Sequence, residues 1–258
     1  MNKKMVARLL RVQKHSLWET AILQRLGDRE TQQDRAGYRV ASDASCCILV
    51  AADGLGGHQG GEEAAAAAVS AMLESWRGQP GTDEATLRRC IDEAQEQVAE
   101  VSRRFAHEAR TTCVALVLGQ SEACWSHLGD SRLYVFRQGD TIYKSKDHSV
   151  ARLMLQSGEL NEEEARTGPE QGRLYKSLGP DTGQEYQVSQ TAVTSEDRYV
   201  LCTDGFWVNV SEAEMGAALQ APDLEEAFGA LADLAVTRAR GESDNVTVCA
   251  ARPLFEVG

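Results

Sequence analysis

Four aspartates lie at the ends of predicted apolar strands. Asp53 follows the run "ILVAA", Asp130 follows "CWSHLG", Asp204 follows "YVLCT", and Asp244 comes directly before "NVTVC". Any one of them is explained equally well as a turn former. If the four strand ends converge, however, carboxylates about 4 Å apart repel by roughly 4 kcal/mol at an effective dielectric near 20, so the cluster needs protons or cations. Oxygen ligands without paired histidines or cysteines favour Mg²⁺ or Mn²⁺ over Zn²⁺.

The glycine-rich stretch "AADGLGGHQGG" around Asp53 has the strand, turn and helix setting of a phosphate-binding loop. Its glycines miss the G-x-G-x-x-G spacing, because Gln59 occupies the last required position, and the G-K-[ST] ending of a P-loop is absent. A carboxylate at the mouth of the turn also weakens direct phosphate binding. We therefore predict that the turn presents Asp53 to a metal ion and meets phosphate through metal and water.

Charge and composition limit the class of protein. The 258 residues carry a formal net charge of −12, which repels nucleic acids and anionic membranes and favours metal cations. The seven cysteines lie mostly in apolar runs and form no C-x-x-C pair, as is typical of core residues in a reducing cytosol. No signal peptide or membrane insertion is predicted, so a cytoplasmic protein is expected. The length favours one domain over 18–258 behind a basic N-terminal extension over 1–17.

The elements that must position the aspartates follow from the hydrophobic pattern. Two strands within Trp18 to Val40 are predicted to flank a polar loop that holds Arg29 and Asp34, and a helix is predicted over Ala64 to Trp76. The clearest helix carries an apolar stripe of Leu87, Ile91, Ala94, Val98, Val101 and Phe105.

The second half of the chain begins with four strands from Thr111 that are predicted to form one antiparallel meander. The polar segment Ser149 to Lys176 predicts a short helix and an exposed flap over about 158–173. A strand over Arg198 to Cys202, a helix over Asp223 to Arg240 and the final strand "NVTVCAAR" complete the domain. Because strands and helices come in blocks, the pattern favours the α+β class over a doubly wound sheet.

Seven motifs in this order resemble the PP2C-type, or PPM family, metal-dependent serine/threonine protein phosphatases in their compact bacterial form. They are "RETQQD", "AADGLGGHQGG", "LGDSRLYVFR", "KDHSVARLMLQSGEL", "LYKSLG", "LCTDGF" and "SDNVTV". The resemblance spans about Trp18 to Arg252. It implies a four-layer α-β-β-α sandwich, with two central antiparallel sheets flanked by helices and a metal cleft at one end of the sandwich.

The resemblance also implies a metal site with two Mn²⁺ or Mg²⁺ ions. Asp53 is expected to bridge the ions, the Gly54 carbonyl to ligate the second ion, and Asp204 and Asp244 to hold the first. Asp34 is expected to bind through water.

Further roles are implied around these ligands. Arg29 is expected to grip the substrate phosphate with its planar fork. Asp130, together with Asp204, is expected to hold a weaker third ion. Gln33 and Asn245 are expected to support the site, although some relatives carry a glutamate where Gln33 stands, which weakens the second ion's environment.

The acid for the leaving group is less defined. Leu55 stands where eukaryotic members carry a histidine, so His58 or a metal-bound water is a candidate acid. A turn histidine packed on the helix start is an equally good interpretation of His58. His148 matches a family motif, and we interpret it as a structural residue that positions its loop.

The implied function is hydrolysis of phosphoserine and phosphothreonine by in-line attack of a metal-bridging hydroxide, which reverses a serine/threonine kinase. The motifs of a cysteine-nucleophile phosphatase, of a D-x-D phosphotransferase and of a G-x-S-x-G hydrolase are absent. Two alternatives remain: a catalytically weak phosphoprotein-binding scaffold, and a phosphatase of a partner-switching regulator. A monomer is expected, with specificity set by the flap and with a preference of this acidic chain for basic-flanked phosphosites.

Overall fold

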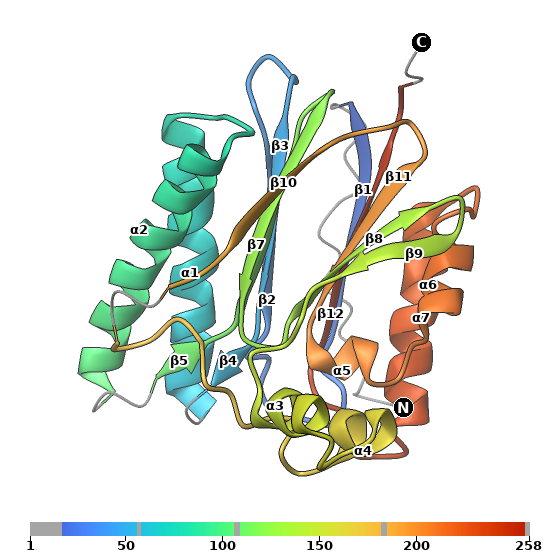
Figure 1. Cartoon of the computed structure of the whole chain (residues 1–258). Helices are drawn as coiled ribbons and strands as arrows, with labels where there is room; N and C mark the ends of the chain where they lie inside the picture. The colour runs from blue at the N-terminus through green and yellow to red at the C-terminus, as the bar shows by residue number, and fades with distance from the viewer. Residues whose placement is uncertain (1–16, 56–57, 106–108, 182–184, 256–258) are drawn as a thin grey trace, which may run out of the picture.

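The computed structural model describes residues 17–55, 58–105, 109–181 and 185–255, which form two packed antiparallel sheets with helices on both outer faces (Figure 1). In the described residues, one sheet has the order β1-β12-β11-β8-β9 and the other has the order β10-β7-β6-β3-β2. The strands of the first sheet are β1 (Trp18–Arg25), β8 (Arg132–Arg137), β9 (Asp140–Lys144), β11 (Asp197–Cys202) and β12 (Val246–Pro253). Those of the second are β2 (Arg35–Val40), β3 (Cys47–Ala52), β6 (Cys113–Leu118), β7 (Glu122–Leu128) and β10 (Val188–Ala192). A short pair, β4 (Gly54–Leu55) with β5 (Arg110–Thr111), lies beside them.

The four layers follow from the two-residue period of the strands. In β3, Cys47 and Leu49 point into the core between the two sheets, whereas Ile48 and Val50 point to the helices on the outer face. Strands covered on both faces read as continuous apolar runs, which explains stretches such as "CILVAA". The predicted α+β sandwich is therefore confirmed.

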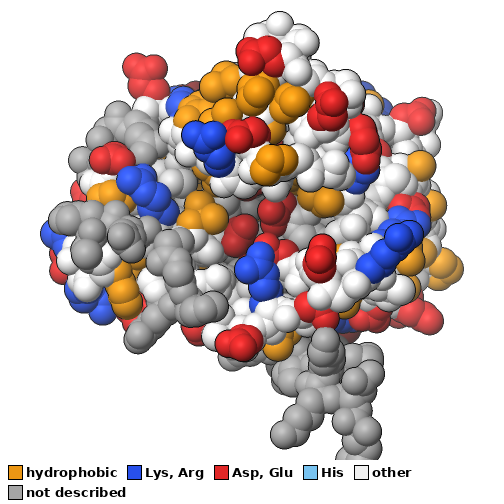
Figure 2. Space-filling view, turned by 90° about the horizontal axis from the view of Figure 1, so that it is seen from below, with side chains coloured by type: hydrophobic (Ala, Val, Ile, Leu, Met, Phe, Trp, Pro, Cys, Tyr) orange, Lys and Arg blue, Asp and Glu red, His pale blue; other side chains and the backbone are white. Residues whose placement is uncertain are grey.

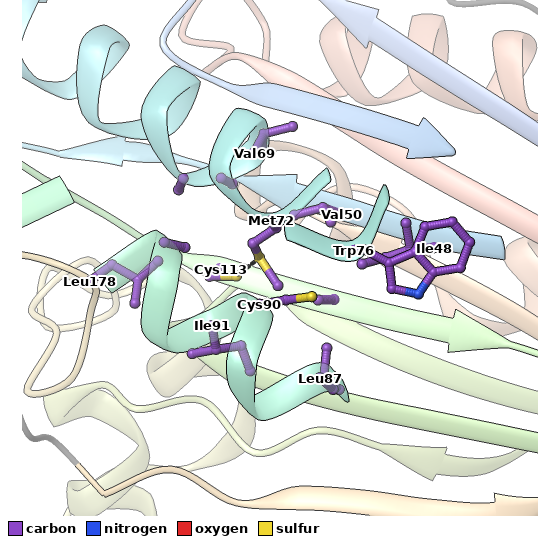
Figure 3. Packing of buried hydrophobic residues seen from close by; sticks show 14 of the residues in the cluster. Ile48, Val50, Val69, Met72, Trp76, Leu87, Cys90, Ile91, Cys113 and Leu178 are labelled. Atoms are coloured by element: carbon purple, nitrogen blue, oxygen red, sulfur yellow. Dashed lines mark hydrogen bonds between the residues drawn. The ribbon is translucent and has the colours of Figure 1, made fainter. Parts of the chain in front are cut away.

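Two long helices cover the second sheet. They are α1 (His58–Gly78) and α2 (Glu84–Arg104). Figure 3 shows Met72 and Trp76 of α1 packed with Cys90 of α2, and the Cys113 thiol lies 3.4 Å from the Met72 sulfur. The predicted stripe from Leu87 to Val101 is buried, and the Asp83 carboxylate caps α2 by accepting a hydrogen bond of 2.7 Å from the Thr86 N–H.

The first sheet is covered by helices from the C-terminal part of the chain. They are α5 (Asp204–Trp207), α6 (Glu212–Ala218) and α7 (Leu224–Arg238). Phe206 and Phe228 stack within this layer, with ring centroids 6.4 Å apart. The described residues contain no helix long and apolar enough to cross a membrane, and all seven cysteines are buried and free. The predicted extension over 1–17 lies outside the described residues except for Leu17.

The predicted four-strand meander is wrong. β6 and β7 belong to one sheet and β8 and β9 to the other, so the chain crosses between sheets over residues 129–131. Gly129 makes this crossing with a φ of +102°, and a Cβ at this position would lie 2.7 Å from Thr112 Cγ2. Alternating apolar residues define a strand but do not say which sheet it joins. The crossing places Asp130 between the ends of the two sheets.

The segment predicted as one short helix and a flap contains two helices, α3 (Val150–Ser157) and α4 (Glu162–Thr167). Asn161 and Glu164 form a capping box at the start of α4, which explains how a helix without a buried residue forms there. Figure 1 shows α3 and α4 at the lower end of the sandwich, next to α5.

Candidate metal centre

The aspartates predicted from the strand ends meet at the lower end of the sandwich. Burial raises the pKa of Asp53 well above its usual range, and the nearby carboxylates of Asp34, Asp204, Asp130 and Asp244 raise it further. Mutual effects of this kind require that the side chains lie close together. Figure 2 shows the lower face of the molecule, where acidic side chains gather in a central hollow.

Asp53 is fixed by its backbone at the end of β3. Its N–H donates a hydrogen bond of 2.8 Å to the Thr112 hydroxyl, and its carbonyl accepts hydrogen bonds of 2.8 Å from the Thr112 N–H and from the Thr111 hydroxyl. The side chain is partly exposed. The backbone therefore holds Asp53 while its carboxylate stays available.

Gly54 lies in close backbone contact with the first turn of α1. A Cβ at Gly54 would lie 2.2 Å from the Gly61 carbonyl oxygen and 3.0 Å from the Gln33 carbonyl oxygen. Only glycine allows this approach, which brings the loop of Gln33 next to the carbonyl predicted as a ligand.

Asp204 and Asp244 approach each other through the turn after β11. A Cβ at Gly205 would lie 2.2 Å from the Asn245 carbonyl oxygen and 3.4 Å from Asp244 Cβ, so glycine is required there. Burial and the charge of Asp244 raise the pKa of Asp204 to about 6. These two carboxylates share one end of the neighbouring strands β11 and β12.

Asp34 is buried beneath this pair. Its Oδ2 accepts a hydrogen bond of 2.8 Å from the Thr203 hydroxyl. Burial raises its pKa to about 8, although hydrogen bonds from Thr247 and Thr203 oppose the rise. Asp204 and Asp244 add to the rise, which places Asp34 within the same cluster.

Arg29 is exposed and paired with a predicted ligand. Its Nη2 donates a hydrogen bond of 2.7 Å to Oδ2 of Asp244, and more than half of its side chain is exposed. Asn245 fixes the loop that carries Arg29: its amide donates to the carbonyls of Leu26 and Thr31, and its Oδ1 accepts from the Gln33 N–H at 2.7 Å. Arg29 therefore reaches the cluster from an anchored loop.

Asp130 is buried and held by two residues from other segments. The Gln171 side-chain amide donates a hydrogen bond of 2.8 Å to its Oδ2, and the Trp207 indole N–H donates one of 3.0 Å to its carbonyl. Burial raises the pKa of Asp204, whereas Gln171 lowers it. Gln171 was not predicted from the sequence, because a glutamine in a polar segment carries no signal of its own.

The structure describes the side chain of His148 but not that of His58. His58 begins α1, but its side chain lies outside the described residues, so its predicted role stays a prediction. His148 Nδ1 accepts a hydrogen bond of 3.2 Å from the Gly129 N–H, and its ring stacks on His127 with centroids 4.6 Å apart. It thus anchors the loop before Asp130, which confirms the predicted structural role.

The donor set fits a divalent cation by its chemistry. The side chains and carbonyls offered are oxygen donors, which Mg²⁺ and Mn²⁺ prefer. Burial, together with the neighbouring carboxylates, raises the pKa of Asp53 and of Asp130. Within the described ranges, no three Asp, Glu, His or Cys side chains are arranged to hold a metal ion as they stand. Like charges repel, so a cation between these carboxylates would stabilise the cluster.

Comparison with known proteins gives a consistent result. The family model "Protein phosphatase 2C" matches residues 24–239. The serine/threonine phosphatase stp of Listeria monocytogenes is 29% identical over 229 residues, which cover 85% of this chain and 89% of that protein. The serine/threonine protein phosphatase PstP of Mycobacterium tuberculosis is 32% identical over 222 residues, which cover 84% of this chain and 42% of PstP.

Solved structures agree with this match. The crystal structure of the Mycobacterium tuberculosis phosphatase PstP/Ppp superposes with a TM-score of 0.80 at 27% identity, covering 92% of this chain and 99% of that one. The catalytic domain of PstP in complex with two manganese ions gives a TM-score of 0.79 at 27% identity, with the same coverage of both chains.

Proposed function

The chain belongs to the protein phosphatase 2C family and is a metal-dependent protein serine/threonine phosphatase, and from this premise we propose that its reaction takes place at a binuclear Mn²⁺ or Mg²⁺ centre. The observation that carries the proposal is the convergence of aspartates at neighbouring strand ends: Gly205 next to Asp204 approaches Asp244, and the Thr203 hydroxyl donates to Asp34 at 2.8 Å. A cluster of five buried or half-buried carboxylates is unfavourable unless cations compensate it.

Asp53, the Gly54 carbonyl, Asp204 and Asp244 are the groups that would hold the ions in the proposed centre. Bound divalent cations supply an activated water for attack on phosphorus and neutralise charge on the phosphoryl oxygens. Asp34 lies beside the centre, where its carboxylate is held by a hydrogen bond from the Thr203 hydroxyl. Asp130 is the proposed ligand of a weaker third ion.

Arg29 is the proposed phosphate ligand. Its guanidinium pairs with Asp244 at 2.7 Å, at an exposed position beside the cluster. A planar guanidinium offers two parallel donors to a phosphate. Arg29 would become available for this contact when bound metal ions compensate the charge of Asp244, its present partner. Arg29 would then orient the phosphoryl group for attack.

The biological setting follows from the same activity. The proposed substrates are phosphoserine and phosphothreonine in proteins, with a serine/threonine kinase as the opposing enzyme. A cytoplasmic location and a monomeric state stay predictions from the sequence. The predicted ligand set is complete in the chain, which argues against an inert scaffold.

The test is hydrolysis of p-nitrophenyl phosphate and of a phosphothreonine peptide by the metal-stripped protein. Addition of Mn²⁺ or Mg²⁺ should restore turnover, and two ions should bind per chain in a calorimetric titration. Full turnover in excess EDTA would exclude the proposal.

A further inference from the structure

A partly open cavity of about 600 Å³ lies outside the carboxylate cluster. Its walls come from the flap helices α3 and α4, from the segment after α5, and from the end of β9. Figure 1 shows these elements next to one another at the lower end of the sandwich. None of the proposed metal ligands lines this cavity.

The lining is locally basic in an acidic protein. It includes six basic residues and four acidic ones, whereas the whole chain carries a net charge of −12. Four of the basic residues are in ion pairs. The other two, Lys146 and Arg152, form no ion pair with any residue in the described ranges. Two uncompensated cations in one cavity favour an anionic occupant.

Arg152 is the more informative of the two. Its Nε is buried and has no hydrogen-bond partner among the described residues. The residue also lies in the first turn of α3, where the positive end of the helix dipole disfavours a cation. A buried donor without an acceptor costs free energy, and an anion in the cavity would remove both penalties.

Trp207 connects the cavity with Asp130. The Arg132 guanidinium stacks on the Trp207 ring, 3.3 Å from the ring centroid. The Trp207 indole N–H donates a hydrogen bond of 3.0 Å to the Asp130 carbonyl. Trp207 and Arg132 both line the cavity. A peptide whose phosphoresidue occupies the carboxylate cluster therefore has the cavity within reach of a neighbouring residue.

We propose that the cavity binds an acidic side chain of the phosphoprotein substrate, a carboxylate or a second phosphate, through Arg152 and Lys146. This inference rests on the proposed function and adds a substrate preference to it. It also reverses the preference for basic-flanked phosphosites that the net charge suggests, because the charge around Arg152 and Lys146 is opposite in sign to that of the whole molecule.

The experiment compares phosphothreonine peptides that carry either two glutamates or two glutamines at matched positions, with the acidic pair placed at several distances on either side. Turnover is measured with Mn²⁺, and equilibrium binding is measured separately by fluorescence polarisation. The wild type should favour the glutamate peptide. Arg152→Gln should raise KM for that peptide about tenfold, the loss expected for one charge-assisted hydrogen bond.

The same variant should leave the glutamine peptide and p-nitrophenyl phosphate unchanged. Lys146→Gln serves as the second variant if Arg152→Gln unfolds. Arg88→Gln is the matched control, because Arg88 is an exposed arginine of α2 that is paired with Glu84. Equal binding of the two peptides by the wild type, or an equal loss for all substrates in Arg152→Gln, would overturn the inference.

Two further outcomes separate the explanations. Inorganic phosphate also competes at the metal centre, so its effect is compared between the two peptides. If phosphate weakens binding of the glutamate peptide more than that of the glutamine peptide in the wild type, but weakens both equally in Arg152→Gln, the cavity is an anion site. If the wild type hydrolyses neither peptide nor p-nitrophenyl phosphate, the proposed function fails, whereas the binding measurement still decides whether the cavity prefers the acidic peptide.

Discussion

The Gln171 side-chain amide donates a hydrogen bond of 2.8 Å to Oδ2 of Asp130, and this contact joins the flap to the carboxylate cluster. Burial raises the pKa of Asp204, and the same side chain lowers it. An uncharged donor near two carboxylates stabilises their ionised forms without adding charge. Gln171 is therefore placed to couple the position of the flap to the electrostatics of the cluster.

Substitution of Gln171 should expose this coupling. Gln171→Glu places another carboxylate beside Asp130 and Asp204, so the metal-free variant should unfold at a lower temperature than the wild type. Saturating Mn²⁺ should restore most of the loss, because cations compensate the added charge. Gln171→Ala is the control without the new charge. An equal Mn²⁺-induced shift in Tm for wild type and Gln171→Glu would contradict the coupling.

Arg29 should contribute to substrate binding more than to metal binding. Arg29→Ala removes the proposed phosphate fork and should raise KM for p-nitrophenyl phosphate about tenfold. Bound manganese should stay at the wild-type level, because removal of the Arg29 guanidinium leaves the Asp244 carboxylate free to bind a metal ion. Arg29→Lys keeps the charge but loses the fork, so its KM should be intermediate. An unchanged KM in Arg29→Ala would exclude Arg29 as the phosphate ligand.

Gly205 should tolerate no side chain. Gly205→Ala would bring a Cβ to 2.2 Å from the Asn245 carbonyl oxygen, so the first turn of α5 has to shift. We expect a loss of about 2–4 kcal/mol in the free energy of unfolding, measured with denaturant. Gly78→Ala is the matched control, because a Cβ there meets nothing within 4 Å. Equal stability of the two variants would show that the approach of Gly205 to Asn245 is not tight.

The aspartates could be predicted from the sequence because each follows or precedes an apolar strand, and strand ends of a sandwich meet at a shared edge. The sequence could not place β7 and β8 in different sheets, since both have the same alternation and a three-residue connection suits either arrangement. The exact start of α1 was also missed, because helix propensity is strongest in the alanine run that follows Gly61.

Residues that act through long-range contacts left no signal. Gln171 is 41 positions from Asp130, and Asn245 is more than 200 positions from the loop that it anchors. Nor does a local pattern mark Arg152, whose Nε is seen to lack an acceptor among the described residues only once the flap is packed against the rest of the molecule.

His148 should make stability depend on pH. Burial, together with the positive charges of His127 and Lys176, lowers its pKa to about 3. Because the unfolded state then binds more protons, stability should fall as pH drops below the usual histidine pKa of about 6.5 and continue to fall toward pH 3. Protonation of Nδ1 would also break the hydrogen bond from the Gly129 N–H.

The measurement is the free energy of unfolding between pH 7 and pH 4.5 for wild type and His148→Asn. The carboxylates with raised pKa values change stability in the opposite direction, and the difference between the two proteins cancels their shared contribution. The difference should shrink as the pH falls. A difference that stays constant across this range would show that His148 does not titrate as inferred.

The most direct test of the metal centre is a calorimetric Mn²⁺ titration of Asp53→Asn beside a turnover assay of the same preparation. Asparagine keeps the shape of the side chain and removes its charge. Asp43→Asn is the matched control, because Asp43 is exposed in the turn between β2 and β3. We predict that Asp53→Asn loses Mn²⁺ binding and phosphopeptide hydrolysis together while Asp43→Asn keeps both. Wild-type Mn²⁺ affinity and turnover in Asp53→Asn would contradict the proposed centre.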